Sequence, residues 1–215
     1  MALAEDIKGF MQRFFEQNDP DLVERASAGL DSVVRATPST GALGVGDPAP
    51  EFTCTDIHGR SERLAPRFRR NPVVLNFHRG GWCPFCSLEL RAWQAHLGGL
   101  RAAGGQLLAI TPEAPGSAAE HADEHDLGFP ILIDEDQTIA ARFGLIFDLP
   151  AAAREAQTRL GASLDRANAD GSWRLPVPAT YVVDTSGTIR WAHVADDYTD
   201  RAEPGDVIAA VRALD

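Results

Sequence analysis

Cysteine, lysine and long apolar runs are all scarce in this sequence of 215 residues. Its three cysteines, Cys54, Cys83 and Cys86, are too few to form the disulfide framework of a small secreted scaffold. Lys8 is the only lysine, which excludes Schiff-base chemistry from the rest of the chain. No apolar run approaches the ~20 residues that span a bilayer, and the acidic start does not resemble a signal peptide. The sequence therefore predicts a cytoplasmic protein without a membrane segment.

Acidic side chains outnumber basic ones by 31 to 20, so the formal net charge is −11. Nucleic-acid binding is disfavoured, because such a chain repels phosphates and has no cluster of basic and aromatic residues to overcome that repulsion. No glycine-rich phosphate loop follows a predicted strand, so we expect no bound nucleotide or flavin. The length allows one sizeable domain plus an extension, with a core large enough to fold without disulfides.

Apolar residues recur at helical spacing in the N-terminal part of the chain, which predicts two helices. We interpret residues 1–43 as a helical extension with a linker, and residues 44–215 as the main domain. The apolar face of the extension either covers part of the domain core or forms the contact of a homodimer. The first helix is indicated by Leu3, Ile7, Phe10, Met11, Phe14 and Phe15, and the second by Leu22, Ala26, Leu30, Val33 and Val34.

Strand and helix patterns alternate through the rest of the chain. This alternation, which ends in a hairpin and a helix, predicts an α/β fold: a three-layer sandwich with a central mixed β-sheet. The predicted strands are a hairpin over residues 52–64 and segments 72–77, 106–111, 131–134, 180–184 and 188–194; the predicted helices are 87–101, 117–125, 138–143, 151–160 and 204–214.

Cys83 and Cys86 lie between the strand at 72–77 and the helix at 87–101. This position puts them at a helix N-terminus, where unpaired N–H groups and the helix dipole favour an anion such as a thiolate. A helix N-terminus and the Cys-x-x-Cys spacing lower thiol pKa values, and the charge of Arg79 can add to that effect. The same spacing brings the two sulfurs within bonding distance, so the pair can cycle between dithiol and disulfide.

The structural alternatives for this pair are inert buried cysteines and a zinc half-site. A zinc site needs four ligands, and Cys54 is the only other cysteine, so a four-cysteine site cannot form. His121 and His125 match an inverted zinc-protease pattern, but their acidic stretch is typical of an exposed helix face. We therefore predict no metal, an inert buried Cys54, and a redox-active pair. His78 is either a structural histidine or a proton shuttle.

The segment around the cysteines resembles the AhpC/TSA peroxiredoxin-like proteins of the thioredoxin superfamily. The resemblance extends over about residues 44–215, and it implies a thioredoxin-like fold and reduction of hydroperoxides by cysteine. In that chemistry a thiolate attacks the peroxide, and the resulting sulfenic acid condenses with a second thiol. An external dithiol donor, such as a thioredoxin- or glutaredoxin-like protein or a small thiol, then reduces the product. The resemblance rests on segments 46–52, 73–90, 129–134, 139–144 and 178–184.

The chain also departs from the family pattern. Alignment with the family signature places Cys86 at the peroxide-attacking position, with Arg79 where the signature has proline and Cys83 where it has threonine or serine. Pro178 stands where many peroxiredoxins carry an arginine, and it is our candidate for the cis-proline that faces the dithiol in thioredoxin-like proteins.

The order in which the two sulfurs react stays open at this point. The apolar stripe of the following helix places Cys86 on the buried face and leaves Cys83 as the more exposed thiol, whereas the family alignment favours Cys86 as the attacking residue. Trp82 either packs over the site or is a core aromatic. Glu89 either forms a hydrogen bond near the site or belongs to an acidic first helical turn. Arg79 either polarises the peroxide or is a solvated charge.

The function predicted from these features is a thiol-dependent peroxidase that works through a Cys83/Cys86 dithiol-disulfide cycle without a cofactor. Two alternatives share the same motif. One is a thiol-disulfide oxidoreductase of the thioredoxin or glutaredoxin kind, and the other is a redox sensor without catalytic activity.

Overall fold

The computed structural model describes residues 2–36, 41–159 and 164–214. Residues 37–40 of the predicted linker and residue 160 of a predicted helix lie outside these ranges. So do the side chains of four apolar positions predicted for the second helix, which are Leu22, Ala26, Leu30 and Val34. No helix in the described ranges is long and apolar enough to cross a bilayer.

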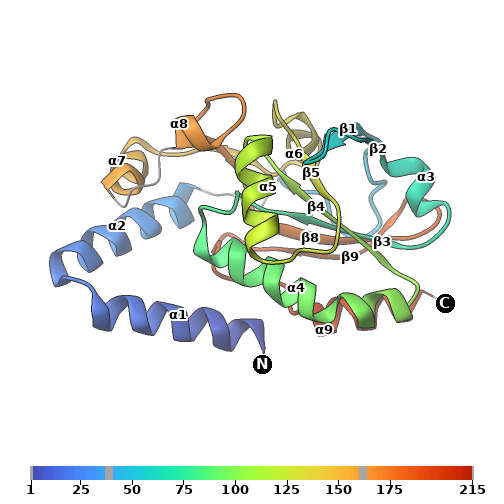
Figure 1. Ribbon diagram of the computed structural model, residues 1–215, viewed down its shortest axis with the longest axis horizontal. Helices are drawn as coiled ribbons and strands as arrows, with labels where there is room; N and C mark the ends of the chain where they lie inside the picture. The colour runs from blue at the N-terminus through green and yellow to red at the C-terminus, as the bar shows by residue number, and fades with distance from the viewer. Residues whose placement is uncertain (1, 37–40, 160–163, 215) are drawn as a thin grey trace.

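A mixed sheet of seven strands forms the centre of the molecule (Figure 1). The parallel strands β3, β4 and β5 lie in the middle, while β1, β2, β8 and β9 pair antiparallel toward the two edges. The predicted α/β fold with a mixed sheet is therefore confirmed. The order across the sheet is β2 (Ser61–Arg63), β1 (Thr53–Asp56), β5 (Ile131–Ile133), β4 (Gln106–Thr111), β3 (Val73–Phe77), β8 (Ala179–Val183) and β9 (Ile189–Val194).

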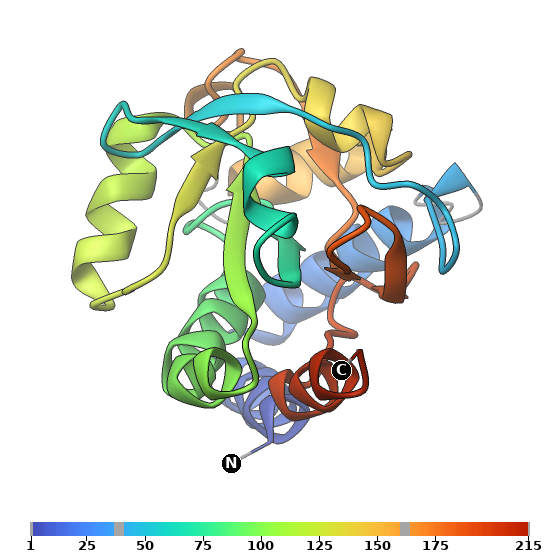
Figure 2. The same ribbon diagram turned by 90° about the vertical axis from the view of Figure 1, so that its right-hand side faces the viewer.

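Alternating residues of the strands build two hydrophobic cores, one on each face of the sheet. On one face Val74 and Val182 pack against α4 (Pro84–Ala102) and α9 (Pro204–Arg212), which lie side by side in Figure 2. On the other face Leu75 and its neighbours pack against α3 (Leu64–Phe68) and α6 (Thr138–Arg142). Every residue of β3 is buried, as expected for a central strand covered on both faces.

Two N-terminal helices, α1 (Leu3–Gln17) and α2 (Pro20–Ala36), precede the sheet. α1 packs against α4, and α2 packs against α7 (Ala151–Arg159). Leu3 and Ile7 of α1 are buried in the larger core, so the helix covers part of that core.

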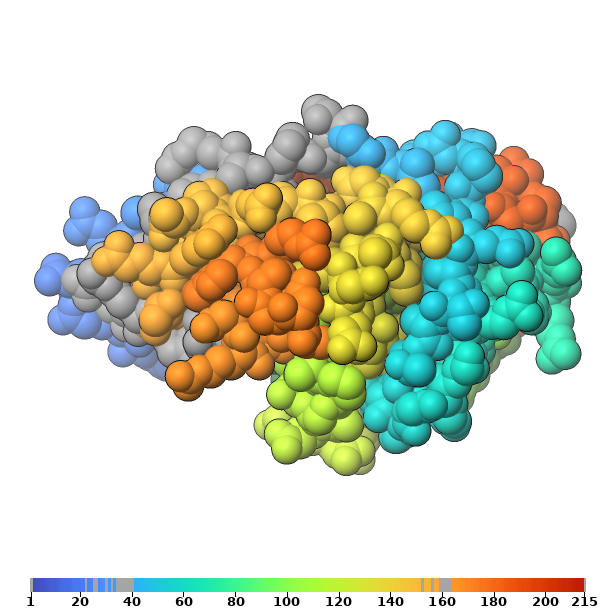
Figure 3. Space-filling view, turned by 90° about the horizontal axis from the view of Figure 1, so that it is seen from above, coloured from blue at the N-terminus to red at the C-terminus, as the bar shows by residue number. Residues whose placement is uncertain are grey.

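Several elements were not predicted from the sequence. They are α3, the strands β6 (Ile146–Asp148) and β7 (Arg174–Pro176), and the short helix α8 (Leu164–Ala167). β6 and β7 form a separate two-stranded sheet. Seen from above, the segment that contains α7, α8 and β7 lies between α2 and the hairpin of β1 and β2 (Figure 3). The remaining helix, α5 (Pro115–Glu124), follows β4.

Candidate active site

The two cysteines lie where β3 passes into α4. Helix α4 begins at Pro84, three residues earlier than predicted. Proline suits the first position of a helix, because its fixed φ is helical and its missing N–H would have no partner there. Cys83 is therefore the N-cap residue, and Cys86 lies in the first turn. Both sulfurs are shielded from solvent: Cys83 is 3% exposed and Cys86 is 0% exposed. Cys83 is the more exposed of the two, as predicted, but only by this small margin. Phe85, which lies between the cysteines, packs against Phe10 of α1 and against Tyr198.

Three donors converge on the sulfur of Cys86. The backbone N–H of Arg79 donates to it at 3.4 Å, Nη2 of Arg201 donates at 3.6 Å, and the thiol of Cys83 donates a third hydrogen bond. Burial alone would raise the pKa of Cys86, but the Cys83 hydrogen bond and the Arg201 charge outweigh it and hold that pKa well below its ordinary value. The hydrogen bond to Cys86, together with burial, raises the pKa of Cys83 well above its ordinary value. The pair thus consists of one thiolate and one thiol.

Arg201 is a residue that the sequence analysis missed. It precedes α9, is 7% exposed, and forms a buried ion pair with Glu89 of α4. Glu89 also accepts a hydrogen bond from Nδ2 of Asn76 at 2.7 Å, and Asn76 donates to Oγ1 of Thr180 at 3.1 Å. Burial alone would lower the pKa of Arg201, but the Cys86 thiolate and the Glu89 carboxylate outweigh burial and raise that pKa above its ordinary value. This network supplies a guanidinium beside Cys86.

One signal for that network was present in the sequence. Asn76 interrupts the apolar run of β3 and is fully buried. A buried amide needs hydrogen-bond partners, so its position next to the cysteine motif indicated a polar network there. Nothing near Arg201 indicated that it would be one of the partners, because 112 residues separate it from Glu89.

Arg79 is 1% exposed, so its interpretation as a solvated charge is wrong. Its guanidinium lies 4.3 Å from the ring centroid of Tyr198 and 5.6 Å from that of Phe147. Burial lowers its pKa, but the nearby sulfurs oppose that shift. Its Nε and Nη2 atoms have no hydrogen-bond partner among the described residues. A buried charge with free donors therefore lies near the dithiol.

The other predicted site residues are also gathered near the carboxyl end of β3. Trp82 is half-buried and packs against the core that contains the cysteines. Burial lowers the pKa of His78 to about 4, so its imidazole is neutral. Pro178 is buried and directly precedes Ala179, which pairs with Phe77. The described part of the chain contains no cis peptide bond, so the cis-proline hypothesis for Pro178 is wrong.

Glu89 lies beyond the first turn of α4, which contains no acidic residue. Its first-turn interpretation is therefore wrong, and its ion pair and hydrogen bond give it a place in the network around Cys86. Burial raises the pKa of Glu89, and the charge of Arg201 opposes that rise.

Cys54 lies on β1, apart from the pair, because β5 and β4 separate β1 from β3. It is half-buried rather than fully buried, and all three cysteines are free thiols. Burial raises the pKa of Cys54 to about 12, and the neighbouring carboxylates of Asp134, Glu62 and Asp56 add to this rise. Such a thiol is inert near neutral pH.

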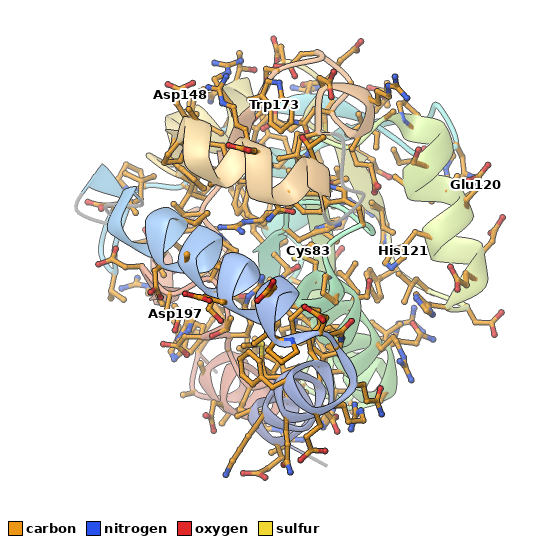
Figure 4. All side chains as sticks on the ribbon, turned by 90° about the vertical axis from the view of Figure 1, so that its left-hand side faces the viewer. Cys83, Glu120, His121, Asp148, Trp173 and Asp197 are labelled. Carbon is orange, nitrogen blue, oxygen red and sulfur yellow. The ribbon has the colours of Figure 1, made fainter. Side chains whose placement is uncertain are left out.

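Helix α1 packs against α4, whose first turn follows Cys83. Phe85, between the two cysteines, meets Phe10 of α1 edge to face at 5.6 Å and Tyr198 at 5.5 Å. The carboxylate of Glu203 accepts hydrogen bonds from the N–H groups of Leu3 and Ala4 at 2.9 and 2.8 Å. Figure 4 shows Cys83 in the view between α2 and α7.

Residues 45–192 match the family model described as the AhpC/TSA family. The chain belongs to the AhpC/TSA family. Its sequence is 31% identical over 105 residues to a Mycobacterium tuberculosis protein described as a candidate peroxiredoxin, an alignment that covers 49% of this chain and 66% of that protein. It is 26% identical over 156 residues to peroxiredoxin Bcp of Escherichia coli, with 73% of this chain and 87% of Bcp covered.

A similar fold occurs in the crystal structure of peroxidoxin BcpB from Mycobacterium tuberculosis. The TM-score is 0.64 at 20% sequence identity, and the match covers 80% of this chain and 99% of BcpB. The thioredoxin-like peroxiredoxin fold expected from the resemblance is therefore confirmed.

Proposed function

We propose that this protein is a thiol-dependent peroxidase that reduces hydrogen peroxide or organic hydroperoxides, with Cys86 as the attacking thiolate and Cys83 as the resolving thiol. The observation that carries the proposal is the asymmetry of the pair. The pKa of Cys86 lies well below its ordinary value, and that of Cys83 lies well above. At neutral pH one sulfur is a nucleophile, and the other keeps the proton that it needs for the next step.

The first step converts the thiolate of Cys86 to a sulfenic acid. The sulfur attacks the terminal oxygen of the peroxide, an S–O bond forms, and the O–O bond breaks. The departing oxygen takes up a proton and leaves as water or an alcohol. Three donors already surround the sulfur before substrate arrives, so little reorganisation is needed as charge moves from sulfur to oxygen.

Arg79 is the candidate for binding the peroxide. Its side chain is buried against aromatic rings, and its charge interacts with both sulfurs. The free Nε–H and Nη2–H groups can donate to peroxide oxygens, and they favour the transition state because negative charge develops on the departing oxygen. This role depends on the positive charge of Arg79, which guanidinium groups keep in proteins.

The second step forms the disulfide. The thiol of Cys83 attacks the sulfur of the Cys86 sulfenic acid, and its proton leaves with the hydroxyl group as water. The hydrogen bond between the two residues means that the sulfurs are close before oxidation begins. An external donor then returns the pair to the dithiol state, either a thioredoxin- or glutaredoxin-like protein or a small thiol. Because both sulfurs are covered, a small thiol should reach the disulfide more readily than a protein.

Thiol-disulfide exchange is a second candidate function, because a low-pKa thiolate beside a thiol at a helix start also suits that chemistry. The burial of the pair argues against a protein disulfide as substrate. A protein disulfide must bring its sulfur into line with the thiolate, and both sulfurs here are almost fully covered. Small hydroperoxides face a much lower steric barrier.

The test is the consumption of hydrogen peroxide and of an organic hydroperoxide in the presence of a regenerating dithiol. We expect a wild-type rate well above that of free thiol, and a sulfenic acid that can be trapped on Cys86 in Cys83→Ser but not in Cys86→Ser. A wild-type rate equal to that of free thiol would reject the peroxidase. Rapid reduction of insulin disulfides would then favour exchange, and oxidation without turnover in either assay would favour the sensor.

A further inference from the structure

We propose that Glu113, Ser87 and His121 form a clamp on Gly81 that positions Cys83 for disulfide formation. None of the three was predicted to belong to the site. The proposal rests on the proposed function where it concerns peroxide, and it assigns these residues to the resolving step rather than to the attack by Cys86.

Side chains bind both backbone polar groups of Gly81. Its N–H donates to Oε2 of Glu113 at 2.9 Å, and its carbonyl accepts a hydrogen bond from Oγ of Ser87 at 3.1 Å. There is no room for a side chain at this position, since a Cβ atom on Gly81 would lie 2.4 Å from Cγ of His121. Gly81 lies two residues before Cys83, so these contacts fix the turn that leads to that cysteine.

His121 completes the clamp from α5. The sequence predicts an exposed helix face here, but His121 is only 9% exposed, and Nε2 lies 2.9 Å from Oγ of Ser87. The Ser87 hydroxyl also lies 3.4 Å from the carbonyl oxygen of Cys83, and it donates to a carbonyl when His121 carries its proton on Nε2. Figure 4 shows His121 on the side of α5 toward Cys83, with Glu120 on the outer side. His121 thus differs from its acidic neighbours because it holds the turn.

Glu113 is itself held in place. It is 4% exposed, and its backbone N–H donates to Oγ1 of Thr111, the last residue of β4, at 3.2 Å. A Cβ atom on Gly80, whose φ is +136°, would lie 3.2 Å from the Glu113 carboxyl carbon and 2.6 Å from Nε1 of Trp82. The carboxyl group of Glu113 and the indole of Trp82 therefore leave room only for glycine at position 80, and the positive φ also favours glycine.

The clamp acts on Cys83 rather than on Cys86. Cys86 is inside the helix and is held by the donors on its sulfur. Cys83 is the N-cap, its side chain makes no capping hydrogen bond, and its N–H donates to the carbonyl of Gly80 at 3.2 Å. Release of the turn should therefore displace the resolving thiol and leave the thiolate in place.

The experiment separates attack from resolution in Glu113→Ala and Glu113→Gln. Each reduced protein is mixed with one equivalent of hydrogen peroxide and quenched over time, and mass spectrometry measures sulfenic acid and disulfide. We expect Glu113→Ala to form the disulfide about tenfold more slowly, the effect of one lost hydrogen bond. The sulfenic acid should form within about threefold of the wild-type rate, because Arg201 and the backbone N–H of Arg79 still donate to the Cys86 thiolate when Cys83 moves. Glu113→Gln should stay within about threefold of wild type, because its amide oxygen can still accept from Gly81.

Ser87→Ala is the second variant, since it releases the carbonyl side of Gly81 without touching Glu113. It should slow disulfide formation in the same direction as Glu113→Ala. Wild-type rates of disulfide formation in both variants would overturn the clamp, and so would a Glu113→Gln rate as slow as that of Glu113→Ala.

A second oxidant distinguishes failure of the clamp from failure of the proposed function. With a small disulfide such as hydroxyethyl disulfide, the Cys86 thiolate attacks one sulfur and releases one mercaptoethanol thiolate. Cys83 then displaces the second mercaptoethanol to form the same disulfide. If peroxide does not oxidise the wild type, the peroxidase is rejected, but the closure of the mixed disulfide still measures the clamp. The same tenfold slowing in Glu113→Ala would support it, and an unchanged closure rate would reject it.

Discussion

Cys86 is fully buried and Cys54 is half-buried, yet the more deeply buried thiol has the lower pKa. Burial raises the pKa of each thiol. At Cys86 a thiol, a guanidinium and a backbone N–H overcome that effect. At Cys54 the neighbours are three carboxylates, which increase it. The difference teaches that the donors and charges around a thiol can reverse the effect of burial on its pKa.

Removal of each sulfur gives the largest expected contrast. Cys86→Ala should lower peroxide consumption at least about a thousandfold, because it removes the nucleophile. Cys54→Ala should leave the rate unchanged. Steady-state peroxide consumption measures both. A large loss of activity in Cys54→Ala would break the comparison.

Loss of the guanidinium beside Cys86 should be the next largest effect. Arg201→Met leaves the buried carboxylate of Glu89 without its partner, and we expect the free energy of unfolding to fall by about 3–5 kcal/mol. The rate of attack on peroxide should also fall, because the thiolate loses the guanidinium that donates to it. Urea unfolding and stopped-flow oxidation measure the two effects.

The double variant Glu89→Gln with Arg201→Met is the matched control. It removes the unpaired carboxylate, so most of the lost stability should return. The pKa of Cys86 should still lie above its wild-type value, because Arg201 is absent. If thiolate absorbance at neutral pH were that of wild type in this double variant, Arg201 would not be a source of the low pKa.

The buried carboxyl of Glu113 should make stability depend on pH. Its pKa is raised to about 7, mainly by burial, so its neutral form stabilises the fold at low pH. This contribution is present below the unfolded-state pKa and is lost as pH rises toward 7. Between pH 4.5 and 7.5 the wild type should therefore lose up to about 3 kcal/mol relative to Glu113→Gln. Urea unfolding of both proteins at several pH values measures the difference, and parallel curves would contradict it.

The smallest expected effect concerns the hydrogen bond within the pair. Cys83→Ala removes the thiol that donates to Cys86, which should raise the pKa of Cys86 toward its ordinary value. Ultraviolet absorbance of the thiolate, titrated in a Cys54→Ala background, measures the shift. An unchanged titration would mean that Arg201 and the backbone N–H of Arg79 supply the whole effect.

Local patterns in the sequence predicted the parts of the site that depend on neighbours along the chain. The apolar run of β3, the cysteine motif and the start of α4 follow one another, so their arrangement could be predicted. Arg201 could not, because it reaches Cys86 from 115 residues away. The burial of His121 was missed for a related reason. The acidic residues around it do face outward, but the contact that buries it comes from α4.

Two features show where local signals were ambiguous. Arg79 could equally have been a solvated charge, and only the rings of Tyr198 and Phe147, which come from distant segments, decide otherwise. The strands β6 and β7 are each three residues long, too short for a periodic pattern to stand out.

The carboxylate of Glu203 has a practical consequence for handling the protein. It binds the first N–H groups of α1, although it stands at the N-cap of α9, and it lies only two residues after Arg201. A fluorescent label or affinity tag joined just ahead of Leu3 would lie beside the hydrogen bonds to Glu203, and so beside the segment from which Arg201 reaches Cys86. Attachment beyond α9 avoids that segment, so a comparison of tags at the two positions should precede any kinetic work.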